Sequence, residues 1–113
     1  QDYSKAREWY EKAAKQEHAD AQFNLGFMYA NGQGVKQDYS KAREWYEKAA
    51  KQEQADAQFN LGFMYANGSG VEQSDFLAMR WYGRAAAQGD DEAKKRCNGI
   101  LQKRRKQKQR GEI

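Results

Sequence analysis

The chain of 113 residues fits one domain, and no apolar run in it approaches the roughly 18 residues that a membrane-spanning helix needs. It has 13% aromatic residues, no Pro and many strong helix formers, so its mean hydropathy of -1.23 indicates polar helix surfaces and not disorder. Residues 1–93 hold 11 Lys or Arg against 15 Asp or Glu, while residues 94–113 hold 9 against 1, which confines any strongly basic binding surface to the C-terminal end.

A tandem repeat organises most of the sequence. Residues 1–36 match residues 37–72 at 33 of 36 positions, and a third copy begins at Gln73 and then diverges. A period of this length is typical of a solenoid, in which a unit buries its apolar face only when a neighbour stacks on it. We therefore predict a repeat array over 1–101, with units at about 1–36, 37–72 and 73–101, the last of which is a diverged cap.

Each unit is predicted to form two helices. The first is expected at about 2–16 and 38–52, and the second at about 19–30 and 55–66. The first helix buries one stripe, which in the second unit consists of Ala42, Trp45, Tyr46, Ala49 and Ala50. Asp38 is placed to cap a helix N-terminus, and Gly68 can end a helix in the left-handed conformation. We therefore expect about six helices in an all-α superhelix of tandem hairpins.

The second helix of each unit carries two different stripes. Its core stripe consists of Ala21, Leu25, Met28 and Tyr29, and Gly26 beside it allows a neighbouring helix to approach closely. The other stripe carries an Asp followed by Phe and Asn side chains. Its members are Asp20, Phe23, Asn24, Phe27 and Asn31, and in the next unit Asp56, Phe59, Asn60, Phe63 and Asn67.

The run AQFNLGFMYANGQGV followed by DYSKAREWYEKAA resembles the Sel1-like repeat family, a relative of the tetratricopeptide repeat, over about residues 1–93. The resemblance implies a right-handed α-solenoid that holds a protein or peptide in its groove and does not catalyse a reaction. It also favours a bacterial protein, periplasmic or secreted more than cytoplasmic. The family usually has Gly in the turn after the Trp-bearing helix. Glu17 and Glu53 stand there and only Gly89 conforms, which leaves the hairpin angle open.

Repeats of this family are counted from the helix that carries Asn-Leu-Gly, so this chain starts in mid-unit. Its first helix is therefore expected to lack a partner, and end-to-end association of copies would cover the exposed face. We interpret the chain as a piece of a longer array. A recent duplication, or a truncated or designed consensus-like array without a native ligand, is the alternative that one sequence leaves open.

In tetratricopeptide-like solenoids the face that corresponds to this stripe lines the concave groove. Rings there can supply contact area to a peptide, and carboxamides can pair with its extended backbone. The alternative is that the Phe rings wedge between successive hairpins. The third unit favours that alternative, because its last helix has no following neighbour and loses both rings. Lys95, Arg96 and Gly99 stand there at the positions of Phe23, Asn24 and Phe27. Asn24 and Asn60 are the stronger candidates for contact with a ligand.

No catalytic constellation, metal site or cofactor site is expected. The Asn-Gly-Gln-Gly-Val loop lacks the Lys and Ser/Thr of a phosphate-binding loop, and turn formation explains its glycines. His18 is the only His and Gln54 replaces it in the next copy, so no second ligand stands at metal-binding spacing. Cys97, the only Cys, is interpreted as a small buried residue in an apolar stripe with Ala93, Ile100 and Leu101.

The segment over 102–113 is basic and is predicted to extend the last helix and then to be disordered. Its cations are Lys103, Arg104, Arg105, Lys106, Lys108 and Arg110. We favour a solubilising role, in which they also complement the negative end of the helix dipole. The alternative is a tether to nucleic acid or an anionic membrane. No aromatic residue follows Tyr82, so a nucleic-acid tether would rest on phosphate contacts alone.

Overall fold

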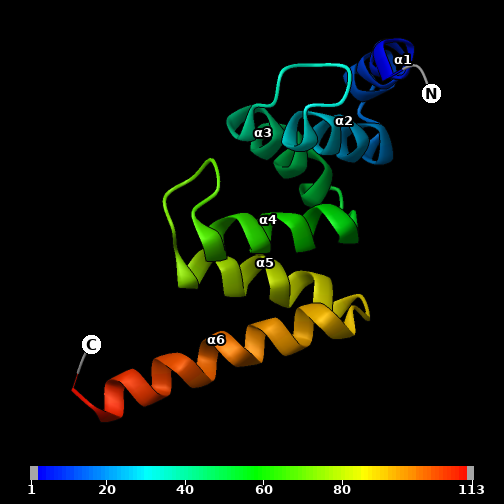
Figure 1. The fold of residues 1–113 in the computed structure, drawn as a ribbon. Coiled ribbons are helices and arrows are strands. Elements are labelled where there is room, and N and C mark those ends of the chain that lie inside the picture. The colour runs from blue at the N-terminus through cyan, green and yellow to red at the C-terminus, as the bar shows by residue number, and fades with distance from the viewer. Residues whose placement is uncertain (1–2, 112–113) are drawn as a thin grey trace.

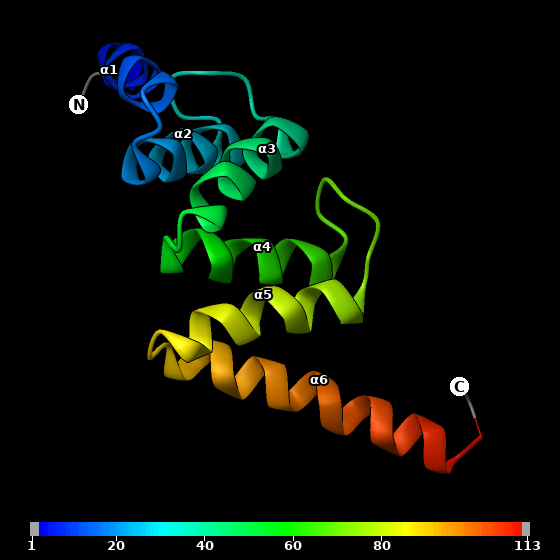
Figure 2. The same ribbon diagram turned by 180° about the vertical axis from the view of Figure 1, so that it is seen from behind.

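The computed structural model describes residues 3–111, so Asp2 and the other terminal residues within the predicted bounds lie outside the described part. Within residues 3–111 there are six helices and no strand: α1 (Tyr3–Lys15), α2 (Ala19–Asn31), α3 (Tyr39–Lys51), α4 (Ala55–Asn67), α5 (Asp75–Ala87) and α6 (Asp91–Gln109). They stack in chain order into a body of 52 × 27 × 21 Å, with the N- and C-terminal helices at opposite ends (Figures 1 and 2). The predicted all-α superhelix is confirmed.

Capping residues stand at the ends of several helices. The carboxylate of Asp38 accepts a hydrogen bond from the Lys41 amide at 3.1 Å, and Ser74 and Asp90 cap α5 and α6 in the same way. Gly68 follows α4 in the left-handed conformation, with φ at 68°. The predicted roles of Asp38 and Gly68 are therefore confirmed.

The closest helix contacts are made by α2 with α3 and by α4 with α5. Gly26 lies against α3, where a Cβ would come within 2.6 Å of the Tyr46 ring, and Gly62 lies equally close to Tyr82 on α5. The glycine therefore permits the ring to sit directly on the backbone of the preceding helix. The close approach predicted at Gly26 is confirmed.

The Trp side chains of the three units differ in burial. Trp81 on α5 is 7% exposed and packs with Leu61 of α4, and Trp45 packs against Leu25 of α2. Trp9 on α1 is 76% exposed, because no helix of the described part precedes α1. The first helix thus presents the unpaired face that the mid-unit start predicts.

Two fully buried glutamines form a ladder between hairpins that the sequence analysis did not foresee. Gln58 Nε2 donates to the Ala50 carbonyl at 3.1 Å, and Gln58 Oε1 accepts from Gln88 Nε2 at 2.8 Å. The same bonds recur one repeat earlier among Gln22, Ala14 and Gln52. Since a buried amide is costly unless it is paired, the ladder fixes how neighbouring hairpins stack.

The turns after α1, α3 and α5 share the left-handed conformation. Glu17 has φ at 62°, Glu53 has φ at 64°, and Gly89 has φ at 99°. The turn geometry is therefore kept where the family's glycine is absent, so the hairpin angle does not depend on glycine. A side chain in this conformation is strained because its Cβ crowds the carbonyl oxygen.

We therefore expect Glu17→Gly to raise the free energy of unfolding by about 1 kcal/mol, because it relieves the left-handed strain at an exposed site. Urea denaturation followed by circular dichroism measures the change. Glu53→Gly should gain less, because the Glu53 carboxylate accepts hydrogen bonds from Arg84 at 2.6 Å and from Gln58 at 3.1 Å. An equal gain in both variants would contradict a stabilising role for these bonds.

The last helix packs less tightly than predicted. Cys97 is half-buried and not buried, with its thiol 3.7 Å from the Met79 carbonyl, and Leu101 is 38% exposed. Only Ala93 of the predicted stripe is fully buried, because α6 has no following helix in the described part to cover its outer side. None of the described helices is both long and apolar enough to cross a membrane.

Candidate functional site

Two equivalent hollows lie one repeat apart on the face formed by α2 and α4, which we call the groove. One, of about 270 Å³, is lined by Tyr3, Tyr10, Asn24 and Phe27, among others. The next, of about 250 Å³, is lined by the equivalent residues of the second unit, Tyr39, Tyr46, Asn60 and Phe63, with Phe27 as its other wall. The repeat therefore builds the same subsite twice.

The Phe residues of the predicted stripe have two different roles. Phe23 packs on Tyr46 with ring centres 5.7 Å apart, and Phe59 packs edge-on against Tyr82 at 5.3 Å. Phe27 and Phe63 are 43% and 44% exposed and line the hollows. Neither of the two interpretations therefore holds for the whole stripe, because the first Phe of each pair packs between helices and the second lies open in the groove.

The two Asn candidates are half-buried and each lines a hollow. Burial raises the pKa of Tyr46 to about 12, and a hydrogen bond with the Asn60 side chain acts in the opposite direction. The phenol of Tyr46 is therefore protonated throughout the neutral pH range. Asn60 thus brings its carboxamide and a neutral hydroxyl together at the wall of the hollow.

The remaining members of the predicted stripe lie at the ends of the helices. Asn31 and Asn67 donate to the carbonyls of Phe27 and Phe63 at 2.8 Å, so their amide groups also serve the last turn of each helix. Asn31 lines the second hollow as well. Asp20 and Asp56 are exposed in the first turns of α2 and α4, where negative charge suits the helix dipole.

A cation, Arg96, lies at the end of the groove on α6. Arg96 stands at the position of Asn60, and its guanidinium carbon lies 5.3 Å from the centre of the Phe59 ring and 5.6 Å from that of Phe63. Its Nε lies 3.2 Å from the Glu92 carboxylate. The repeat places Arg96 at the position of Asn24 and Asn60, but no role was predicted for it, because its contacts with the two rings depend on how α6 packs against α4.

The cations of the C-terminal segment lie along α6, which runs to Gln109. Arg104 forms an ion pair with Asp75 of α5 at 3.6 Å. The other five are exposed: Lys103, Arg105, Lys106, Lys108 and Arg110. Both ribbon views show the C-terminal part of α6 projecting from the stack on the side of the α4–α5 loop (Figures 1 and 2).

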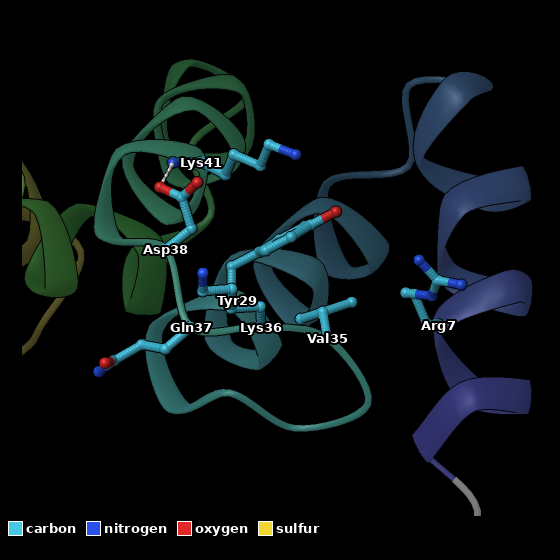
Figure 3. Close-up of a pocket in the computed structure, with 7 residues that line it drawn as sticks. All are labelled: Arg7, Tyr29, Val35, Lys36, Gln37, Asp38 and Lys41. Atoms are coloured by element: carbon cyan, nitrogen blue, oxygen red, sulfur yellow. Dashed lines mark hydrogen bonds between the residues drawn. The ribbon is translucent and has the colours of Figure 1, made fainter.

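A second pair of hollows lies where the loops after α2 and α4 meet the preceding hairpin. Figure 3 shows the first, of about 380 Å³, in which Asp38 turns back to the Lys41 amide and the Lys41 ammonium lies 5.5 Å from the Tyr29 ring centre. The equivalent hollow has Ser74 and Leu77 in place of Asp38 and Lys41. Because its chemistry is not repeated, this pair offers no repeating subsite, unlike the groove.

Metal-ligating side chains do not gather anywhere between residues 3 and 111: no three His, Cys, Asp or Glu residues lie together there. His18 is exposed at the start of α2, and its side chain makes no capping bond.

The repeat pattern of the Sel1 family matches residues 1–18, 19–53 and 55–90. A Sel1 repeat protein from Oxalobacter formigenes is 42% identical over 80% of the chain, with a TM-score of 0.78. A protective antigen of uropathogenic Escherichia coli strains, which displays an SLR fold, is 41% identical over 82%, with a TM-score of 0.81. Cysteine rich protein B of Helicobacter pylori is 29% identical over 77%, with a TM-score of 0.74.

The chain spans 37%, 20% and 65% of the lengths of these three bacterial proteins, in that order. No match was found among curated proteins. The full matches at 19–53 and 55–90 coincide with the tightly packed pairs α2–α3 and α4–α5, and the match at 1–18 covers α1 alone. With the repeat pattern matched over most of its length and the same fold in these neighbours, the chain belongs to the Sel1 repeat family.

Proposed function

We propose that this chain is a non-catalytic interaction scaffold that holds an extended peptide segment of a partner protein in the groove. Sel1 repeat proteins generally mediate protein–protein interactions. The observation that carries the proposal for this chain is the pair of equivalent hollows, each with an Asn and an exposed Phe at its wall. A repeated subsite suits a ligand that is itself a chain of repeated chemical units, as a peptide backbone is.

The contacts that each hollow offers match the needs of such a ligand. An exposed ring supplies apolar area with little loss of rotamer freedom, and a carboxamide both donates to and accepts from a peptide group. Phe27 borders both hollows, so one ring serves two neighbouring subsites. The groove thus provides anchoring and backbone pairing without any group that reacts.

The test selects 12-residue peptides from a random phage-displayed library and measures their affinity by fluorescence polarisation. We expect Asn24→Ala combined with Asn60→Ala to weaken the selected peptides about tenfold, because each lost hydrogen bond contributes about 0.5 to 1.5 kcal/mol. The melting temperature should change by no more than a few degrees, since both side chains are only half-buried.

Asn98→Ala is the matched control, because Asn98 is exposed on α6 and lines neither hollow. It should leave the affinity unchanged. Selected peptides that bind the double variant as tightly as the parent would place their site outside the groove.

A further inference from the structure

The chemistry of the groove changes along the stack. Asn60, Phe63 and Asn67 of α4 are neutral, and the equivalent positions of α6 hold Arg96, a glycine and Lys103. A side-chain carbon at that glycine would meet nothing within 4 Å, so the surface of α6 is open at this position. The end of the groove on α6 is therefore both roomy and cationic.

The helix then extends this cationic face past the rest of the stack. Whereas α4 ends at Asn67, α6 continues beyond the equivalent Lys103 to Gln109. With 3.6 residues per turn, Lys106 lies on the same face as Lys103, and Arg105 and Lys108 lie on the opposite face. All four side chains are exposed. These four cations therefore divide into a groove-side pair, Lys103 and Lys106, and an outer pair, Arg105 and Lys108.

The arginine on this face has a hydrogen bond with the buried Tyr82 of α5 and one further partner that a ligand can replace. Its partner Glu92 is on its own helix, and both side chains are largely exposed, at 40% and 57%. Such an exposed pair contributes little to stability, so an incoming carboxylate can take the place of Glu92. Stacking on Phe59 and Phe63 holds the guanidinium in position meanwhile.

One edge of the groove, at the N-termini of α2 and α4, carries the opposite charge. Asp20 and Asp56 are exposed in the first turns of α2 and α4, on the same stripe as the Asn and Phe residues. A nucleic acid carries a negative phosphate at every nucleotide, so these carboxylates oppose its passage along the groove. A peptide, in contrast, can be apolar in one part and acidic in the next.

We infer that the groove binds an extended, partly acidic peptide segment, with apolar residues in the hollows beside Phe27 and Phe63 and carboxylates along α6. The carboxylates face Arg96, Lys103 and Lys106. This inference rests on the proposed function and adds the chemistry of the partner and the direction in which it lies.

The test uses the same random peptide library, selected at about 0.15 M salt so that nonspecific charge attraction is screened. Selected peptides should be enriched in Asp and Glu next to an apolar segment. We expect Lys103→Gln with Lys106→Gln to weaken them about fivefold, since each exposed charge pair contributes about 0.2 to 1 kcal/mol. Arg105→Gln with Lys108→Gln removes the same net charge from the outer side and should weaken them less than twofold.

Equal losses in the two double variants would overturn the inference, because net charge and not position would then decide affinity. Tighter binding of an oligothymidine than of every selected peptide would also overturn it, in favour of a nucleic acid partner. Peptides that lack acidic enrichment yet depend on Asn24 and Asn60 would refute the acidic partner and leave the proposed function standing. Failure to select any peptide would refute both.

Discussion

Replacing Gly62 by Leu is expected to lower the free energy of unfolding by about 3 kcal/mol, because α4 and α5 pack there without room for a side chain. A Cβ on Gly62 would lie 2.7 and 2.8 Å from two atoms of the Tyr82 ring. The ring is only 1% exposed and already touches Phe59, so it cannot move aside without disturbing its own cluster. Urea denaturation followed by circular dichroism measures the loss.

A smaller substitution at Gly62 shows whether packing or helix propensity decides stability at this position. Gly62→Ala should still destabilise the protein by about 1 kcal/mol, because the clash exceeds what a helix gains when alanine replaces glycine. Gly83→Ala in α5 is the matched control, since a Cβ there would meet nothing within 4 Å. It should stabilise the protein by about 0.5 to 1 kcal/mol. A gain at both positions would disprove the close contact at Gly62.

The repeat made most of the fold predictable. Two nearly identical copies place every apolar position twice, so the helices, the caps at Asp38 and Gly68, and the close approach at Gly26 all follow from local chemistry and period. The left-handed turns at Glu17 and Glu53 do not follow, because a residue with a Cβ gives no sign of positive φ. There the packing of neighbouring helices imposes a conformation that the local sequence disfavours.

The groove was predictable only in part. A stripe on a helical wheel identified Phe23 and Phe27 together, although Phe23 sits at the edge of the stripe and meets Tyr46 of the next helix. Which of two rings packs and which is open depends on the neighbouring helix, and a single helix does not carry that information. Arg96 was placed at the position of Asn24 but given no role, because a cation on a diverged cap is expected to be solvated, whereas here two rings hold it over the groove.

The glutamine ladder escaped prediction because glutamine is mostly exposed in proteins and its pattern in a helix carries no sign of burial.

The burial of the ladder glutamines predicts a second large effect on stability. Gln58→Glu keeps the shape of the side chain but replaces the Nε2 donor to the Ala50 carbonyl with an acceptor, 3.1 Å from the Glu53 carboxylate in the present structure. We expect a loss of about 3 kcal/mol at pH 7, measured by urea denaturation.

This loss should depend on pH in a defined direction. Burial and the nearby Glu53 raise the pKa of the introduced carboxyl in the folded state above its ordinary value of about 4.3. The loss relative to the parent is therefore smallest below pH 4.3, where the carboxyl is neutral in both states and can donate to Ala50, and it grows as the pH rises through the raised pKa. The same chemical change at Gln54 should cost no more than about 0.5 kcal/mol, because its side-chain oxygen already accepts from the Ala57 amide at the N-terminus of α4, where negative charge is favoured. A loss that is independent of pH would contradict the expectation that the charge of the introduced carboxyl destabilises the folded state.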